Sequence, residues 1–403
     1  MSRNPRPQAP VALIWPALVG AVLRSHALIL KTILRRPATA RRLLRNQQRW
    51  DATGLIRDVN ELEGRGEGTW LRSPWEAGGA PPGTGATLDL DPHLLRLGNG
   101  RILARATDSA VYSASNRMLA FGASSFLRGD DDEHRQLRPH PFYRRPLWQR
   151  PFPWLEPPTQ EEEPVFVLHS PWSHNNYYHF LMDLLPRLGL FLSCCPLEGR
   201  LPKIITTVSQ QGYRAEVLAR TGVPIVSRPA EPCLHLRAPA LYVVALARTN
   251  QDVSPAAIRY LRHLFAPEIT AAPAEPRRLL VLRGEQAKRP MRNEGELAEA
   301  LVARGYEPLR LETLTVAEQA RRFAAAAAVV AQHGAGLTNV AFCRPGTTVV
   351  ELFNHRWHPA MHARISALAG ARHLPIPCQG DSDLSLQVDV PALLGQLESL
   401  GLA

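Results

Sequence analysis

The stretch AQHGAGLTNVAF, residues 331–342, carries residue types suited to holding an anion. The alanine- and valine-rich run before it predicts a buried strand that ends at His333, with a helix beginning a few residues later. The first N–H groups of such a helix are unsatisfied, and the helix dipole makes that end positive. Gly334 and Gly336 let the backbone approach a ligand closely and adopt angles that a side chain forbids. These residues leave two readings open: a phosphate site, or a tight turn in which His333 caps a neighbouring segment.

Basic residues gather at the end of a second predicted strand, RLLVLRG, residues 278–284. The loop after this strand leads to a helix that Asn293 could cap. Cations at the ends of neighbouring strands meet at the mouth of one sheet, where an anion site explains them better than solvation does. These cations are Arg283, Lys288, Arg289 and Arg292.

An acid and a histidine lie four residues apart in SPWSHNNYYHFLMDLLPRL. If this stretch is a helix, His179 and Asp183 share one face. Asp183 could then act as a general base, while His179 orients it or binds phosphate. The alternative is an acid near a helix N-terminus and a histidine bonded to backbone.

The composition is that of a globular protein with room for two domains, since 45% of the 403 residues are hydrophobic and 21% are charged. Five cysteines without a CxxC pattern indicate neither a disulfide framework nor a structural zinc site, and favour a reducing compartment. The net charge of +11 rests largely on arginine, which favours phosphate or carboxylate partners.

The first 50 residues are basic, and their apolar run VALIWPALVGAVL is too short to span a bilayer. No small-residue cleavage site follows, so a signal peptide is not indicated. Residues 11–45 leave two readings open. They form either an amphipathic segment on an anionic membrane surface or a basic leader without such contact.

Three regions follow from the pattern: a basic, Pro/Gly-rich leader and linker (1–85), an N-terminal domain (86–268) and a C-terminal domain (277–403). GNG and SASN turns within residues 86–122 predict β-hairpins. GDDDEH, 129–134, contains a DxD pattern that can hold a metal, but its irregular surroundings favour a solvated loop. PEITAAPAEP, 267–276, supports neither helix nor strand and marks the boundary between the two domains.

From residue 164 onward, buried strands alternate with helices of ten or more residues, most regularly beyond 277. Strands separated by such helices form parallel sheets covered on both faces. The sequence therefore predicts an α/β protein with two doubly wound domains that face a cleft, where the carboxyl ends of the strands bind ligands.

Three segments resemble glycosyltransferase family 61: HNNYYHFLMDLLPRL, LVLRG, and EQARRFAAAAAVVAQHGAGLTNVAFCRPGTTVVELF. The resemblance covers about residues 165–353. It implies the GT-B architecture, two Rossmann-like domains with a nucleotide-sugar donor in the C-terminal one, inverting transfer, and no obligatory metal or other cofactor. It also implies a role in bacterial capsular or other surface polysaccharide synthesis.

On this resemblance, the corner binds the donor diphosphate through backbone N–H groups and hydroxyls, while arginines neutralise its oxygens. Glu351 takes the ribose hydroxyls or is an ordinary acid at a strand end. Asp183 removes the acceptor proton. The expected catalytic residues are Asp183 and His179; the expected donor site comprises Arg283, Arg289, Asn293, His333, Gly334, Ala335, Gly336, Thr338, Asn339 and Glu351.

The expected partners are a nucleotide-sugar donor and a glycan or lipid-linked acceptor, with the protein cytoplasmic and able to contact the inner face of the membrane through residues 11–45. A competing hypothesis is a non-catalytic nucleotide-sugar- or glycan-binding component of a polysaccharide assembly complex. A nucleic-acid-binding role is disfavoured, because the basic residues lack interleaved aromatics and no recognition module is present.

Overall fold

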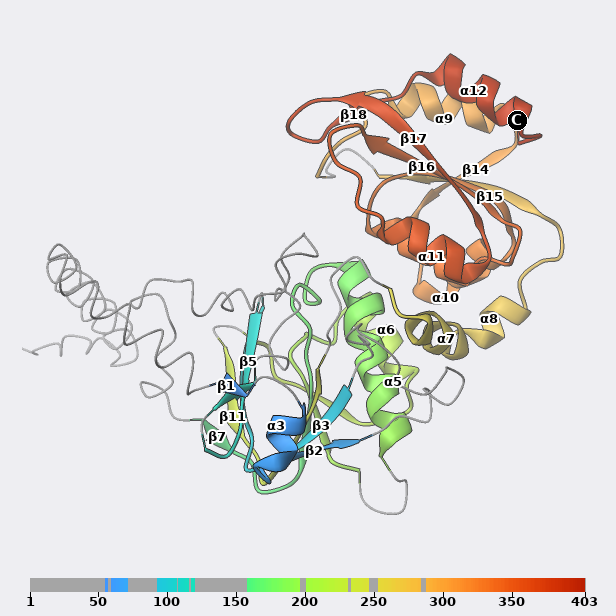
Figure 1. The fold of residues 1–403 in the computed structure, drawn as a ribbon. Helices are drawn as coiled ribbons and strands as arrows, with labels where there is room; N and C mark the ends of the chain where they lie inside the picture. The colour runs from blue at the N-terminus through green and yellow to red at the C-terminus, as the bar shows by residue number, and fades with distance from the viewer. Residues whose placement is uncertain are drawn as a thin grey trace, which may run out of the picture.

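The computed structural model describes residues 55–56, 59–71, 93–106, 108–115, 117–119, 158–195, 201–230, 233–245, 253–283 and 288–402. They form a mixed α/β protein with three six-stranded sheets (Figure 1). The basic segment 11–45 and the acidic stretch 129–134 lie outside the described residues, so the predictions made for them are not tested. Among the helices that the structure describes, none is long and apolar enough to cross a membrane.

The C-terminal sheet has the strand order β14-β13-β15-β16-β17-β18. Its first five strands are parallel, and the short β18 pairs with β17 antiparallel. The predicted alternation of strands and helices beyond 277 is confirmed. The strands are β13 (Arg277–Leu282), β14 (Tyr306–Arg310), β15 (Ala326–Gln332), β16 (Thr348–Asn354), β17 (Arg372–Gly380) and β18 (Leu386–Gln387).

Helices cover both faces of this sheet (Figure 1). Alternate residues of β13 point to opposite faces: Leu279 joins the core that holds Phe323 of α10, whereas Leu280 joins the core that holds Leu297 of α9. A strand buried on both sides has no polar face, which explains the unbroken apolar run in the sequence. The helices α9 (Glu294–Val302) and α12 (Val390–Ser399) cover one face; α10 (Val316–Ala324) and α11 (Met361–Ala369) cover the other.

A second sheet, β10-β9-β8-β12-β3-β2, is parallel over its first four strands. The chain leaves β8 towards a π-helix, η5 (His179–Leu184), which continues into α5 (Leu185–Cys194). The remaining elements are β2 (Gly68–Leu71), β3 (His93–Gly98), β8 (Val165–Leu168), β9 (Lys203–Thr206), β10 (Ile225–Ser227), β12 (Ala240–Ala245) and α6 (Tyr213–Ala219).

In the third sheet, β1-β6-β5-β4-β11-β7, the strands on either side of the predicted SASN turn, β5 and β6, pair antiparallel, and β4 and β5 form a further antiparallel pair. The turn at Asn99-Gly100 is not a hairpin, because β3 and β4 on either side of it belong to different sheets. A Cβ on Gly100 would lie 2.7 Å from Leu97 Cβ, so the crossing is too tight for a side chain. Its elements are β1 (Leu55–Ile56), β4 (Arg101–Arg105), β5 (Asp108–Tyr112), β6 (Met118–Leu119), β7 (Thr159–Gln160) and β11 (Leu234–Arg237); α3 (Val59–Gly64) precedes β2.

Two helices, α7 (Pro255–Leu264) and α8 (Ala266–Thr270), join the N-terminal part to the C-terminal sheet. Ser254 caps α7 as its position predicts, accepting from the Ala256 N–H at 3.2 Å. The expectation that 267–276 contains no helix is wrong, because α8 occupies its first residues. Proline in the first turn suits a helix, and Glu268 is held by Arg220 at 2.6 Å.

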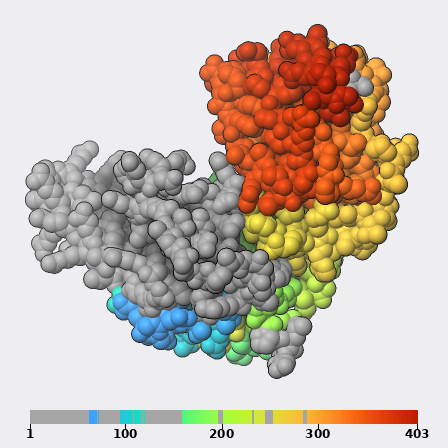
Figure 2. All heavy atoms as spheres, turned by 45° about the vertical axis from the view of Figure 1, so that its right-hand side comes forward, coloured from blue at the N-terminus to red at the C-terminus, as the bar shows by residue number. Residues whose placement is uncertain are grey.

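One apolar core runs through both parts of the molecule. It joins Phe166 and Phe180 of the N-terminal part to Phe265 near α7, and to Phe323 and Phe342 of the C-terminal part. Figure 2 shows the orange and red C-terminal residues packed directly on the yellow segment that holds α7 and α8. The two parts therefore share a single packed joint.

Candidate active site

The C-terminal sheet reverses its winding between β13 and β15. The chain leaves β13 towards α9 on one face and leaves β15 towards η7, which packs with α10 and α11 on the other face, so the loops after these neighbouring strands diverge. A crevice outside the carboxyl ends of such strands is where doubly wound sheets bind ligands. Arg283 follows β13 and His333 follows β15, and Arg283 Nη1 donates to the His333 carbonyl at 2.7 Å. The structure therefore brings the predicted cation and the predicted corner together.

The corner glycines are needed for close approach rather than for unusual backbone angles. Gly334 has φ 166°, an extended conformation open to any residue, so the expectation of a forbidden angle is wrong there. A Cβ on Gly334 would lie 2.5 Å from Arg283 Nη1, and one on Gly336 would lie 2.9 Å from Leu311 Cδ1. The helix that follows is the 3-10 helix η7 (Ala335–Phe342).

Arg283 is fixed by the loop that follows it. Its Nη2 donates to the Lys288 carbonyl at 2.8 Å, and its backbone N–H donates to Glu294 Oε1 at 2.7 Å. Burial, followed by the nearby charge of Arg289, lowers the pKa of Arg283, yet a guanidinium stays protonated in proteins. The corner thus holds a permanent positive charge next to Gly334.

Arg289 is held in a strained conformation over an aromatic ring. Its φ of 63° is left-handed, which is costly for a residue with a side chain. Its guanidinium lies 4.7 Å from the centroid of the Trp357 ring, and the His333 ring meets the same tryptophan edge-on at 4.8 Å. Gln332 Nε2 donates to the Arg289 carbonyl at 2.7 Å and fixes the turn. Arg292, predicted to join these cations, instead pairs with Asp381.

Of three predicted donor-site side chains, two are hydrogen-bonded within the protein and the third is buried. Asn339 is fully buried: its Oδ1 accepts from Tyr177 at 2.8 Å and its Nδ2 donates to Gln319 at 2.7 Å. Thr338 is also fully buried, and its hydroxyl has no hydrogen-bond partner among the described residues. Asn293 lies at the start of α9, but its side chain makes no cap; it bonds the backbone of Val388 through Nδ2 at 2.8 Å and Oδ1 at 3.0 Å. The predicted cap is wrong because this amide joins α9 to the segment before α12.

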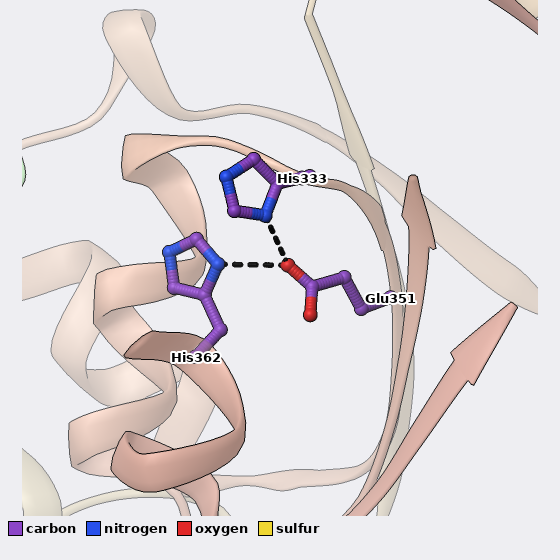
Figure 3. Close-up of side chains that lie close together, drawn as sticks. All are labelled: His333, Glu351 and His362. Atoms are coloured by element: carbon purple, nitrogen blue, oxygen red, sulfur yellow. Dashed lines mark hydrogen bonds and ion pairs between the residues drawn. The ribbon is translucent and has the colours of Figure 1, made fainter. Parts of the chain in front are cut away.

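Glu351, in β16, is fully buried and surrounded by histidines (Figure 3). His333 Nδ1 donates to its Oε1 at 2.5 Å and His362 Nδ1 donates to the same oxygen at 2.8 Å. Burial alone would raise the pKa of Glu351, but hydrogen bonds from histidines hold it well below the ordinary value. Burial lowers the pKa of His333, so this imidazole favours the neutral form. A ribose hydroxyl would have to displace one of these rings, and ribose binding by Glu351 stays a prediction.

The two predicted catalytic side chains meet. His179 Nδ1 donates to Asp183 Oδ2 at 2.6 Å within η5, and the side chains are 14% and 19% exposed. The histidine therefore bonds the acid rather than backbone. Arg187 Nε donates to the Asp183 carbonyl at 3.0 Å, and burial lowers the pKa of Arg187 to about 10 although Asp183 opposes the shift.

The start of η5 touches the C-terminal part directly. Tyr177 bonds Asn339 of η7, and the Tyr178 ring lies 6.4 Å from the His362 ring of α11. Beside this contact, a cleft of about 750 Å³ is lined by Tyr177, Tyr213 and Glu216 on one side and reaches the corner at Gly336. The other side of the cleft is formed by Leu311–Thr315 and Gln319.

Several residues around the corner were not predicted from the sequence. Tyr177, Gln319 and Trp357 have no local pattern that marks them, since each acts through a contact distant in the chain. His358 and His362 are four residues apart, although His358 lies in the loop before α11 and only His362 is on the helix. That spacing, close after an acid at a strand end, was the available signal for the cluster.

A search of the curated proteins finds no match to this chain. A family model does match, and its span begins at Tyr177, two residues before the His179–Asp183 pair. It ends at Val350, after the glycine corner and one residue before Glu351. The matched model is described as Glycosyltransferase 61, so residues 177–350 of this chain are similar to a glycosyltransferase.

Proposed function

We propose that this protein is an inverting glycosyltransferase that moves a sugar from a nucleotide-sugar donor to a hydroxyl of a glycan or lipid-linked acceptor. The observation that carries the proposal is the corner at the β13/β15 crevice, where Arg283 lies against Gly334. The match to the glycosyltransferase model covers the same residues. We further propose a GT-B arrangement, with the donor in the C-terminal part and the acceptor in the N-terminal part.

The donor diphosphate would lie against the corner. The first backbone N–H groups of η7 would bind the phosphate oxygens, and Arg283 and Arg289 carry fixed positive charge at the same corner. Loss of the nucleoside diphosphate develops negative charge on the leaving oxygens. Cations held in place before the reaction stabilise that charge without reorganising, which is the role that a divalent metal has in other transferases. Transfer is therefore proposed to need no added metal.

Asp183 would act as the general base. Its carboxylate takes the proton of the acceptor hydroxyl while that oxygen attacks the anomeric carbon from the face opposite the diphosphate. The new C–O bond forms as the bond to the diphosphate oxygen breaks, and the configuration at carbon inverts. His179 donates to Oδ2 at 2.6 Å and fixes the orientation of the carboxylate, leaving Oδ1 to receive the proton.

We place the reaction in bacterial surface or capsular polysaccharide synthesis, on the cytoplasmic side and at the inner face of the membrane. The support is the sequence: the basic run 11–45 can bind anionic lipid, and the composition is rich in alanine and arginine. The competing function is a nucleotide-sugar-binding component without catalysis, which would keep the corner but have no use for the His179–Asp183 pair.

A thermal-shift screen tests donor binding first. Purified protein is heated with UDP, GDP, CMP, dTDP and their sugars, with and without EDTA. A ligand that binds the native state raises the melting temperature. One diphosphate should give a shift that EDTA leaves unchanged; Arg283→Ala should reduce it, while Arg292→Ala, from the same loop but paired with Asp381, should keep it. No shift with any ligand, or one that requires added metal, would contradict the proposed donor site.

Transfer by Asp183→Asn tests the chemistry. The amide cannot take the proton, so transfer should fall by about 100- to 10,000-fold. The donor-induced thermal shift should stay close to that of the wild type, because Asp183 lies outside the corner. An Asp183→Asn protein with normal transfer would remove this residue from the mechanism, and donor binding without transfer in the wild type would favour the binding component.

A further inference from the structure

The two oxygens of Glu351 have different surroundings. Figure 3 shows one oxygen accepting from both His333 and His362, while the other points away from these rings. This second oxygen, Oε2, is hydrogen-bonded to His358 Nε2 at 3.1 Å and lies 3.0 Å from His373 Nε2. The carboxylate is therefore held on one side by two short hydrogen bonds and faces two further imidazoles on the other.

The tautomer of His373 follows from its neighbour Ser366. The Ser366 hydroxyl donates its one proton to the His362 carbonyl at 2.8 Å. It must then accept from His373 Nδ1, which lies 3.1 Å away. A neutral His373 that carries its proton on Nδ1 presents a lone pair at Nε2. That lone pair faces the lone pairs of Glu351 Oε2 at 3.0 Å, which is repulsive unless a positive charge lies between the two atoms.

The geometry favours an ion over a shared proton. His373 Nε2 is buried and makes no hydrogen bond within the described residues despite its distance of 3.0 Å from Oε2. An N–H on this nitrogen would therefore not point along the line to the carboxylate. A metal ion that lies to one side of the line between His373 Nε2 and Glu351 Oε2 can accept a lone pair from each of these two atoms. Tetrahedral zinc with bonds of 2.0–2.1 Å places its ligands about 3.3 Å apart, only slightly more than the separations found here.

Neighbouring residues hold His373 and Glu351 in the orientation that metal ligands need. The Nδ1–H of His373 is held by Ser366, and the first oxygen of Glu351 is held by His333 and His362. Such partners fix the tautomer and orientation of ligating side chains. The His358 side chain is 26% exposed and gives an ion a route to an otherwise buried group. The nitrogen and oxygen ligand atoms of Glu351, His358 and His373 all lie within 4.8 Å of one another.

We propose that Glu351, His358 and His373 bind a divalent transition-metal ion, with zinc the best fit to two imidazoles and one carboxylate. The ion compensates a carboxylate that is fully buried, and ties β16 to β17 and to the loop that carries His358. Trp357, on which Arg289 stacks, precedes His358 in that loop. With both oxygens engaged in this way, Glu351 would not take the ribose hydroxyls. The proposed diphosphate site at Arg283 and Gly334 is separate and needs no metal of its own.

Metal analysis of the full chain, expressed without a histidine tag, tests the site. Inductively coupled plasma mass spectrometry after gel filtration should find about one zinc ion per chain. His373→Ala and His358→Ala should each lose the ion. His355→Ala is the matched control, because this exposed histidine lies three residues before His358 and its ring is hydrogen-bonded to the Cys378 carbonyl at 3.2 Å, not to Glu351.

Cobalt gives a second readout that does not depend on activity. Protein reconstituted with Co(II) should show the visible absorption band of a low-coordinate site, and His373→Ala should lack it while His355→Ala keeps it. Wild-type protein with no more metal than His373→Ala and no cobalt band would overturn the proposal. So would nitrogen NMR of metal-free protein showing both His373 nitrogens protonated, because a proton would then supply the missing charge. Wild-type metal content decides the matter even if the variants fail to fold.

Discussion

Truncating Glu216 should loosen a helix in the other half of the molecule. Glu216 belongs to α6, yet its two carboxylate oxygens accept the backbone N–H groups of Val316 and Ala317 at 2.8 Å each. These are the first two residues of α10, and Thr315 caps the third N–H of the same helix. The carboxylate thus satisfies donors that the helix itself leaves unpaired.

The expected cost is about 1–3 kcal/mol. A side-chain cap contributes about 0.5–2 kcal/mol, and a negative charge at a helix N-terminus adds about 0.3–1 kcal/mol. The full value for two buried bonds to a charged group would be larger, but Glu216 lines the open cleft, so water can replace it after truncation. Glu216→Gln keeps one accepting oxygen and should recover part of the loss.

Hydrogen exchange of a peptide that covers α10 measures this cost locally. Glu216→Ala should speed exchange of the first turn by about 5- to 150-fold, the equivalent of 1–3 kcal/mol. The matched control is Glu299→Ala, an exposed acid on α9, which should leave α10 unchanged. If exchange in Glu216→Ala is unchanged, Glu216 does not cap α10. If alanine and glutamine at position 216 have equal effects, the stabilisation does not come from an oxygen that accepts the N–H groups of Val316 and Ala317.

Three further predictions concern the corner and the core. Gly334→Ala places a Cβ 2.5 Å from Arg283 Nη1 and should weaken donor binding at least tenfold by calorimetry, whereas Gly295→Ala, with nothing within 4 Å, should not. Tyr177→Phe leaves the buried amide oxygen of its partner without a donor and should lower the free energy of unfolding by about 1–3 kcal/mol in a denaturant titration. Burial, with smaller contributions from nearby charges, lowers the pKa of His169 to about 3, so the unfolded chain binds a proton that the folded one refuses. The free energy of unfolding should therefore not depend on His169 above pH 6.5. Between pH 6.5 and about pH 3 it should fall by up to about 1.4 kcal/mol per pH unit, and His169→Gln should remove that slope.

The elements beyond residue 277 could be predicted because each carries a local signal. Thr315 and Glu318 form the capping box that begins α10, and the apolar run before His333 marks a strand buried on both faces. Arg283 and the corner could be predicted to meet because both follow strands whose carboxyl ends share one edge. The short helix α8 could not be predicted in this way. Its Glu268 is held by Arg220, which ends α6 and lies 48 residues earlier in the chain.

The roles of several site residues depend on contacts that no local pattern encodes. Asn339 reads as a ligand-binding polar group, but Tyr177 and Gln319 use its amide inside the protein. Glu351 reads as a free acid at a strand end, yet rings from four places in the chain enclose it. A sequence shows which groups are polar, whereas burial and partners decide whether they are available.

The apolar core shared by the two halves limits how the molecule can move. Separating the N-terminal part from the C-terminal part would expose Phe265 and Phe342 to water, since their ring centroids lie 5.3 Å apart where the two parts pack. Exposed apolar surface costs about 25 cal/mol per Å², so parting even a few such side chains would cost several kcal/mol. Arg262 adds hydrogen bonds from α7 to the Ala341 and Cys343 carbonyls at 2.9 and 2.8 Å. We therefore expect the two halves to stay packed together as one rigid unit while a ligand enters and leaves the cleft between them.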